Sequence, residues 1–385
     1  MLTPLWYDEY MEFRYQDTCG LKKIDLDAAA APIRAYAQSF DEPFALLPAD
    51  EKLLRDIEAI AAKTVSASVR YILLIGIGGS NLGAKAVYDA LYGSFDTLEP
   101  ARFPKMLFAD TMDPEYNDRL ARFLKTIPRE ELLVIAVSKS GTTVESAENL
   151  KFAPAETPIV FITDRGSPWW EEASARNAER LEIPKEIGGR FSVFSSAGLF
   201  PLRAARIDIA AFRNGAAAIT AANALFSAAA LFLHSQQGKN IHNTFFFHPE
   251  LESLGTWYRQ LLAESIGKNG KGITPTVSLG TTDLHSVGQL YLGGPRDTIT
   301  TFVNAPTNRA MTAIYEGVKK TYQNRGIPFM EILLPDLSPH SLGAFMQFKM
   351  MEVVLLAKLL NVNAFDQPDV DAYKTAARAA HLTTS

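Results

Sequence analysis

The sequence has little cysteine, little net charge and no histidine pattern typical of a metal site. Its 385 residues include one cysteine, Cys19, so no disulfide can form within the chain. Chains without disulfides are typical of a reducing compartment, and we expect a cytoplasmic protein. The histidines show neither an H-x-x-x-H nor an H-E-x-x-H spacing, which disfavours a bound metal.

Net charge and hydrophobic content exclude further classes of protein. The chain carries 38 lysines and arginines against 43 aspartates and glutamates, which gives a net charge of −5 at pH 7. We expect no nucleic-acid partner, because such proteins usually carry a basic face. With 47% hydrophobic residues, the chain as a whole is too apolar to be intrinsically disordered.

The longest stretch without charged residues runs from 216 to 233, roughly enough to span a bilayer. Much of it is alanine, which contributes little to membrane insertion, and it contains Thr220, Asn223 and Ser227. We therefore expect a buried helix here and no membrane association. The N-terminus lacks a basic segment followed by an apolar run, so we also expect no signal peptide.

Short apolar runs alternate with amphipathic segments twice along the chain, which is typical of parallel strands joined by crossover helices. We expect strands over residues 71–75, 105–110, 132–137 and 158–164, and again over 243–247, 276–279, 298–303 and 329–334. Helices are expected over residues 84–91, 114–125, 144–151, 251–266, 285–291, 310–324 and 342–360. The prediction is an α/β protein with two doubly wound, mainly parallel sheets.

This pattern divides the chain into four segments. We expect a helical N-terminal extension over residues 1–65, with breaks at Pro32, Pro43 and Pro48. Two α/β domains should follow over residues 66–207 and 208–361, and a C-terminal helix over 362–385. Doubly wound sheets bind ligands beyond the carboxyl ends of their strands, so the functional loops should lie just after the apolar runs.

A glycine-rich loop follows the first expected strand: Gly76-Ile77-Gly78-Gly79-Ser80-Asn81-Leu82-Gly83. Glycines let backbone N–H groups approach an anion at the start of a helix. A dinucleotide fingerprint would need glycine where Asn81 stands, and the acidic residue Asp110 comes later than that fingerprint requires. A tight turn without a ligand stays open as an alternative to an anion site.

A hydroxyl-rich loop follows the third expected strand: Ser138-Lys139-Ser140-Gly141-Thr142-Thr143. Hydroxyls and backbone amides at the start of a helix suit a phosphate monoester. The loop is not a Walker A motif, because the Gly-Lys-Ser/Thr ending is absent. A helix cap uses only one such hydroxyl, so the loop favours a phosphate site over capping alone.

Residues suited to acid–base chemistry are scattered along the chain. Arg190 follows two glycines and offers a fixed positive charge for a developing oxyanion. Glu264, at the expected end of a helix, has the chemistry of a general base. His285 lies at an expected helix start, and Lys374 lies near the C-terminus. Each residue taken singly is also explained by a structural or surface role.

Together, these motifs resemble those of the glucose-6-phosphate isomerase family. Besides the two loops, the resemblance rests on Gly-Gly-Arg-Phe-Ser-Val-Phe-Ser-Ser-Ala-Gly, Ala-Glu-Ser-Ile-Gly-Lys, Thr-Asp-Leu-His-Ser-Val-Gly-Gln and Phe-Asp-Gln-Pro…Lys, in the family's order. It implies two sugar isomerase (SIS) domains of the sandwich type. The implied activity is the reversible conversion of D-glucose 6-phosphate to D-fructose 6-phosphate through ring opening and a cis-enediolate.

The resemblance also implies residue roles. Glu264 would move a proton between carbon 2 and carbon 1, and Arg190 would face the enediolate. His285 would assist ring opening from the partner subunit of a homodimer, and Lys374 would act at the ring oxygen or hydroxyl. The implied substrate-binding residues are Gly79, Ser80, Ser138, Lys139, Ser140, Thr143, Gln260 and Gln367. No metal or redox cofactor is required for this chemistry.

Other functions stay open at this point. The chain could be another sugar-phosphate isomerase, for instance one that also accepts mannose 6-phosphate. A non-catalytic sugar-phosphate sensor is a second alternative, although the joint presence of Glu264, His285 and Arg190 argues against it. A dehydrogenase is a third alternative, disfavoured by the failed fingerprint at Asn81.

Overall fold

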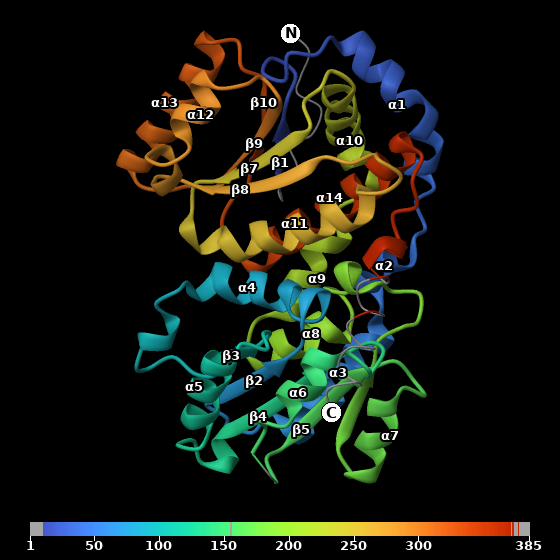
Figure 1. Ribbon diagram of the computed structural model, residues 1–385, viewed down its shortest axis with the longest axis vertical. Helices are drawn as coiled ribbons and strands as arrows, with labels where there is room; N and C mark the ends of the chain where they lie inside the picture. Colours follow the sequence, from blue (N-terminus) through green and yellow to red (C-terminus); the bar gives the residue numbers. More distant parts are fainter. Residues whose placement is uncertain (1–10, 155, 371, 373–375, 377–385) are drawn as a thin grey trace. The chain divides into compact units, whose positions relative to one another are not determined.

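The computed structural model describes residues 11–154, 156–370, 372 and 376. The chain divides into two compact units, one formed by Glu42–Ala210 and the other by Met1–Asp41 together with Ala211–Ser385. Each unit contains its own five-stranded sheet (Figure 1). The boundary after Ala210 lies close to the one predicted between residues 207 and 208. The N-terminal extension predicted over residues 1–65 is divided between the two units at Asp41.

The sheet of Glu42–Ala210 is entirely parallel, with the order β3-β2-β4-β5-β6. Its strands are β2 (Tyr71–Ile75), β3 (Lys105–Ala109), β4 (Leu132–Val137), β5 (Ile159–Thr163) and β6 (Glu179–Glu182). Every residue of β4 is buried, which is why the central strands read as continuous apolar runs. The sequence prediction missed β6, because this edge strand is mostly charged and buries only Leu181.

The second sheet has the order β1-β10-β9-β7-β8 and is parallel except for β1. Its strands are β1 (Glu12–Arg14), β7 (Ile241–Phe246), β8 (Thr274–Leu279), β9 (Thr298–Asn304) and β10 (Phe329–Leu333). The helical prediction for residues 12–14 was wrong. These residues pair antiparallel with the free edge of β10, a partner more than 300 residues away that local pattern cannot reveal.

Helices surround both sheets (Figure 1). The helices of the first unit are α2 (Pro43–Leu46), α3 (Glu51–Thr64), α4 (Leu82–Tyr92), α5 (Pro114–Leu124), α6 (Val144–Leu150), α7 (Pro168–Ala175) and α8 (Ser196–Ala204). Those of the second are α1 (Lys23–Gln38), α10 (Ala221–Gln236), α11 (Glu252–Ile266), α12 (Gly288–Gly293), α13 (Arg309–Asn324) and α14 (Pro339–Leu360), while α9 (Ile209–Ala217) spans the boundary. The predicted α/β architecture with two doubly wound sheets is confirmed.

In each sheet the first of the parallel strands is an interior strand, and the later parallel strands lie on both sides of it. In the first unit β2 lies between β3 and β4, and in the second β7 lies between β8 and β9. The strand order therefore reverses between β2 and β4 in the first sheet and between β7 and β9 in the second. At such a reversal the connecting loops diverge, and sheets of this kind bind ligands in the resulting crevice at the carboxyl ends of the strands. In the first unit, the loops that follow β2 and β4 begin at Gly76 and Ser138.

Two expectations about helices were wrong. Pro32 does not break the N-terminal helix, because α1 continues through it. Proline in a helix interior costs about 3 kcal/mol, and here Leu26 and Ala30 before it and Ile33 and Ala37 after it are all buried and hold the helix in place.

The alanine-rich stretch over residues 216–233 was predicted as one helix but belongs to two. α9 ends at Ala217 and α10 begins at Ala221, with a bend of 69° between them. A capping box closes the start of α10, where the backbone N–H of Thr220 donates to Asn223 Oδ1 at 2.8 Å. In the described chain no single helix is long and apolar enough to cross a membrane, and only this bent pair has the length and composition to do so.

A fully buried polar network lies between α14 and α11. Lys349 Nζ and Glu352 Oε2, one turn apart on α14, are 3.0 Å apart and completely shielded from solvent. Tyr258 donates to Glu352 Oε1 at 2.7 Å, and Ser227 donates to Oε2. Burial lowers the pKa of Lys349 and raises that of Tyr258, with Glu352 opposing the first shift and adding to the second. Each of the two buried charges therefore depends on the other, because a buried charge without a partner is costly.

We predict that Lys349→Met will destabilise the protein strongly, because it leaves the Glu352 carboxylate buried without a cation. The expected loss in free energy of unfolding is about 3–5 kcal/mol, measured by urea denaturation. As a control, the same substitution at the exposed Lys320 of α13 should change it by less than about 0.5 kcal/mol. Equal stability of the two variants would contradict the prediction.

Candidate functional site

The hydroxyl-rich loop after β4 is held by its own side chains. Ser138 Oγ accepts a hydrogen bond from the Gly141 backbone at 3.2 Å and lies 3.2 Å from Thr143 Oγ1. The Thr142 hydroxyl donates to Ser140 Oγ at 3.0 Å. Gly141 has φ 62°, and a Cβ there would lie 2.9 Å from the backbone nitrogen of Trp169, so this turn needs glycine. Ser138, Ser140 and Thr143 are therefore together in one turn at the start of α6.

Lys139 contributes backbone to this turn, while its side chain extends away. Its Nζ donates to the carbonyl of Lys185 at 2.6 Å, and burial lowers the pKa of the ammonium. Below the turn, the Thr163 hydroxyl at the end of β5 donates to the Ser138 carbonyl at 2.7 Å. The adjacent strand thus fixes the base of the loop.

The glycine-rich loop after β2 is in direct contact with the Arg190 loop. A Cβ on Gly79 would lie 2.1 Å from the carbonyl carbon of Gly189, so the two backbones touch only because Gly79 carries no side chain. The Ser192 hydroxyl donates to the carbonyls of Gly79 at 3.1 Å and Gly189 at 2.8 Å. Arg190, only 3% exposed, is thereby held beside the loop that contains Gly79 and Ser80.

Asn81 explains why the glycine-rich loop is not a dinucleotide fingerprint. Its Nδ2 donates to Asp110 Oδ2 at 3.1 Å, so the acidic residue beyond β3 is occupied within the protein. This hydrogen bond connects the loops that follow β2 and β3. It is made by Asn81, the residue that stands where the G-x-G-x-x-G fingerprint needs glycine. The sequence prediction noticed both residues but not their hydrogen bond.

In the second unit, Glu264 lies near the carboxyl end of α11 and is partly exposed. Gln260, one turn earlier on the same helix, donates from Nε2 to Glu264 Oε1 at 2.9 Å. This hydrogen bond fixes the orientation of the carboxylate, and it brings together two predicted site residues four positions apart. The general expectation that site residues follow the strands does not hold for Glu264, which lies on a returning helix.

His285 lies in the loop that leaves the carboxyl end of β8. The predicted helix over residues 285–291 was wrong at its start, because His285 follows a 3₁₀ turn at Thr282–Leu284 and α12 begins only at Gly288. Asp283 anchors this loop by accepting hydrogen bonds from the Leu279 backbone and the Ser286 hydroxyl, both at 2.7 Å. The His285 side chain is exposed.

Gln367 follows α14 in a loop stabilised by short-range hydrogen bonds, including one from the Val370 backbone to its carbonyl at 3.2 Å. Lys374 lies outside the described residues. The predicted site residues therefore fall in two sets, Gly79 to Arg190 in the first unit and Gln260 to Gln367 in the second.

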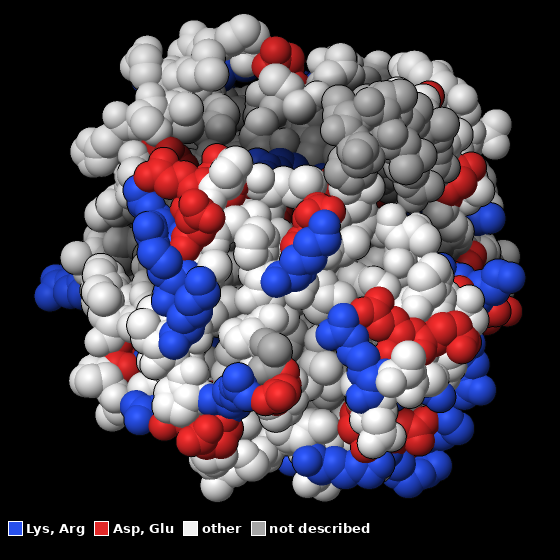
Figure 2. Space-filling model, turned by 60° about the horizontal axis from the view of Figure 1, so that its bottom comes forward, with Lys and Arg blue, Asp and Glu red and all other residues white. Residues whose placement is uncertain are grey.

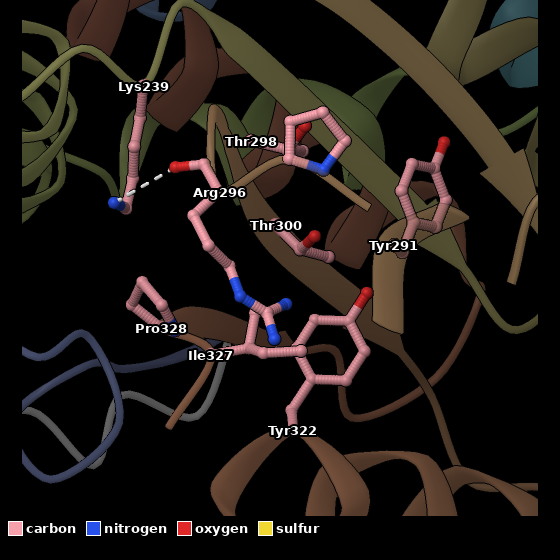
Figure 3. Close-up of a pocket in the computed structure, with 9 residues that line it drawn as sticks. Lys239, Tyr291, Arg296, Thr298, Thr300, Tyr322, Ile327 and Pro328 are labelled. Atoms are coloured by element: carbon pink, nitrogen blue, oxygen red, sulfur yellow. Dashed lines mark hydrogen bonds between the residues drawn. The ribbon is translucent and has the colours of Figure 1, made fainter. Parts of the chain in front are cut away.

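Among the described residues, no group of histidine, cysteine, aspartate and glutamate is arranged to hold a metal ion. The pocket in Figure 3 lies at the amino ends of β7 and β9, where Lys239 Nζ donates to the Arg296 carbonyl at 3.3 Å. The loops that carry the predicted residues Ser138 and His285 follow the carboxyl ends of their strands instead. On the face shown in Figure 2, positive and negative side chains are interspersed.

Comparison with known proteins identifies relatives along most of the chain. The phosphoglucose isomerase family model matches residues 52–157. A probable glucose-6-phosphate isomerase of Methanococcus maripaludis is 33% identical over 338 residues, which cover 78% of this chain and 76% of the relative. The glucose-6-phosphate isomerase of Methanocaldococcus jannaschii is 32% identical over 341 residues, covering 79% and 82%.

A solved structure resembles the fold. The crystal structure of a glucose-6-phosphate isomerase from Chlamydia trachomatis superposes with a TM-score of 0.81 at 20% identity, covering 98% of this chain and 90% of that one. At this identity the likeness concerns the fold alone, and it extends over both units.

We predict that Gly79→Ala will disrupt the first unit's site, because its Cβ would overlap the Gly189 backbone. The two loops must separate, which should cost about 1–3 kcal/mol of unfolding free energy and weaken inorganic phosphate binding measured by calorimetry. Gly188→Ala is the matched control, since its Cβ meets nothing closer than Phe191 Cδ2 at 3.9 Å. An unaffected Gly79→Ala would show that the loops are not in contact.

Proposed function

The chain belongs to the phosphoglucose isomerase family. We propose the following roles for its residues in the reaction. The protein is an aldose–ketose isomerase that interconverts D-glucose 6-phosphate and D-fructose 6-phosphate, a step of glycolysis. Such a reaction needs an anchor for the phosphate, acid–base groups to open the ring, a base beside carbon 2, and positive charge near the enediolate.

The phosphate is anchored by the two loops at the carboxyl ends of β2 and β4. Ser138, Ser140 and Thr143 offer hydroxyls, while Gly79, Ser80 and Lys139 offer backbone amides or a further hydroxyl. This assignment is supported by the clustering of the three hydroxyls in one turn, with Ser138 Oγ 3.2 Å from Thr143 Oγ1. In a chain of net charge −5, the phosphate is held by local hydroxyl and amide donors and not by an overall positive field. Because the phosphate itself does not react, its binding energy can position the sugar.

Glu264 is the base that takes the proton from carbon 2 and returns it to carbon 1. The observation that carries this assignment is the 2.9 Å hydrogen bond from Gln260, which holds a partly exposed carboxylate in one orientation. Gln260 and Gln367 line the sugar. Arg190, fixed by the glycine contact in the first unit, faces the enediolate and stabilises its negative charge. No step requires a metal or redox cofactor.

Ring opening needs an acid and a base, and we assign these roles to His285 and Lys374. His285 is donated by the partner subunit of a homodimer. This arrangement is supported by the topology of the second unit. β7 and β8 are parallel, so α11 returns from the carboxyl end of β7 to the amino end of β8, and Glu264 lies near that amino end.

His285, in contrast, follows the carboxyl end of β8. The six residues of this strand span about 17 Å at about 3.3 Å per residue. Glu264 and His285 of one chain thus lie at opposite ends of β8, too far apart to contact carbons 1 and 2 and the ring oxygen of one substrate. A second copy that supplies the exposed His285 resolves this separation.

The enzyme works in the cytoplasm and also serves gluconeogenesis, since the reaction is reversible. A cytoplasmic location is supported by the lone cysteine, which is free and buried. A related isomerase activity, such as one on mannose 6-phosphate, is the main alternative within the same fold. A non-catalytic sensor of sugar phosphates is the alternative outside catalysis.

We predict that Glu264→Gln will lower kcat by at least about 10², because it removes the general base but keeps a side chain that can bond to Gln260. A coupled assay with fructose 6-phosphate measures this loss, and Glu250→Gln in the loop after β7 serves as a control for removing one carboxylate. Robust turnover by Glu264→Gln would exclude its role as base. Absence of turnover in well-folded wild type would favour the sensor.

We predict that two inactive variants will complement each other. In a heterodimer of Glu264→Gln and His285→Ala, one site combines Glu264 of one chain with His285 of the other and is intact. Random mixing should restore about a quarter of wild-type activity, as expected for a two-fold symmetric dimer. If His285 acts within its own chain, co-refolded mixtures will show no more activity than the separate variants.

A further inference from the structure

A tight turn after α11 carries two lysines that the reaction scheme above does not use. Asn269 and Gly270 both have positive φ, 54° and 70°, as a type I′ turn requires. The flanking residues close the turn with paired backbone hydrogen bonds, from Lys268 to Lys271 at 3.1 Å and from Lys271 to Lys268 at 2.9 Å. An Asn-Gly pair is the strongest short-range sequence signal for such a turn, and it sets Lys268 and Lys271 side by side.

The ammonium group of Lys268 is buried and fully hydrogen-bonded. Its Nζ donates to the carbonyl of Asn363, to the carbonyl of Asp366 at 2.5 Å and to Asp366 Oδ1 at 2.6 Å. These acceptors match the three N–H donors of a lysine. The Lys268 side chain is 6% exposed, so its charge depends on these contacts.

The loop that Lys268 holds is closed on itself as well. Asn363 Nδ2 donates to Asp366 Oδ2 at 3.1 Å, and Asn363 Oδ1 accepts from the Phe365 backbone at 3.0 Å. These hydrogen bonds stabilise the loop from Asn363 to Asp366, and the Lys268 ammonium joins it to the turn after α11. Gln367 is the next residue of the chain, and the segment toward Lys374 follows it.

We infer that Lys268 is a positioning residue, which fixes the 363–366 loop and therefore Gln367 relative to Glu264. Lys268 follows Glu264 by four residues and is joined to it by the end of α11. The lysine thus connects the helix of the base to the loop of a sugar-binding residue. This inference rests on the roles proposed above for Glu264 and Gln367.

Lys271 provides a matched control in the same turn. Its Nζ donates at 2.7 Å to the carbonyl of Leu360, the last residue of α14. A lysine there stabilises the end of the helix, and this hydrogen bond is made to α14 and not to the 363–366 loop. Replacing Lys271 should therefore lower the stability of the protein, whereas replacing Lys268 should also weaken substrate binding.

The experiment uses the full chain and chemical rescue of the missing ammonium. Lys268→Cys and Lys271→Cys are each assayed with fructose 6-phosphate before and after aminoethylation with bromoethylamine, which restores a lysine-like side chain. Because position 268 is itself only 6% exposed, both variants are made in a Cys19→Ala background, modified as unfolded chains, refolded and checked by mass. We expect Lys268→Cys to raise KM about 10-fold, with kcat changed less, and aminoethylation to restore most of the loss.

Lys271→Cys should leave KM within about twofold of the wild type. The inhibition constant of inorganic phosphate, a probe for the first unit's loops, should stay unchanged in both variants. A wild-type KM in Lys268→Cys, or a fall in kcat alone, would assign Lys268 a purely structural role and overturn the inference.

A second variant tests the inference if the first does not fold, and separate assays test the proposed function. If Lys268→Cys does not fold, Asp366→Asn tests the same contact from the other side, and its half-exposed side chain tolerates substitution. This variant should raise KM by about 3-fold or more, and an unchanged KM would overturn the inference. The proposed function is tested separately by wild-type turnover and by Glu264→Gln, so a failure of either is distinguishable from a failure at Lys268.

Discussion

Parallel strands can be joined only by crossovers, and this constraint determines where both sheets can hold chemistry. In each sheet the first parallel strand is an interior one and the later parallel strands lie on both sides of it, so adjacent loops diverge at one place and leave room for a ligand. In the first unit, that place carries the glycine-rich and hydroxyl-rich loops. The contact between Gly79 and Gly189 then adds Arg190 to them. The proposed phosphate anchor and the buried Arg190 beside it thus depend on the sheet topology and on the missing side chain of Gly79.

The same constraint separates the acid–base groups of the second unit. A crossover helix must return to the amino end of the next strand, which places Glu264 and His285 at opposite ends of β8. The homodimer proposed above is one arrangement that would bring these two residues together on one substrate. Gln260 and Lys268 both lie close to Glu264 in the chain. Gln260 donates a hydrogen bond to the Glu264 carboxylate, and Lys268 holds the loop that precedes Gln367.

The central strands were predictable because burial on both faces requires continuous apolar runs, as in β4. The elements at the edges were not. β6 is charged and β1 is only three residues long, so neither has a local pattern that identifies a strand. The course of α1 through Pro32 and the bend between α9 and α10 also depend on tertiary packing, which outweighs the local preferences of proline and alanine.

The sequence by itself determined the α/β class, the two loops that suit a phosphate and the resemblance that named Glu264, His285 and Arg190, because these features depend on residues close together in the chain. Only the tertiary structure decided the contacts of Gly79 with Gly189, Asn81 with Asp110, and Lys268 with Asp366. Each joins segments far apart in sequence, and no local pattern encodes which carbonyl or carboxylate a side chain meets once the sheets have formed.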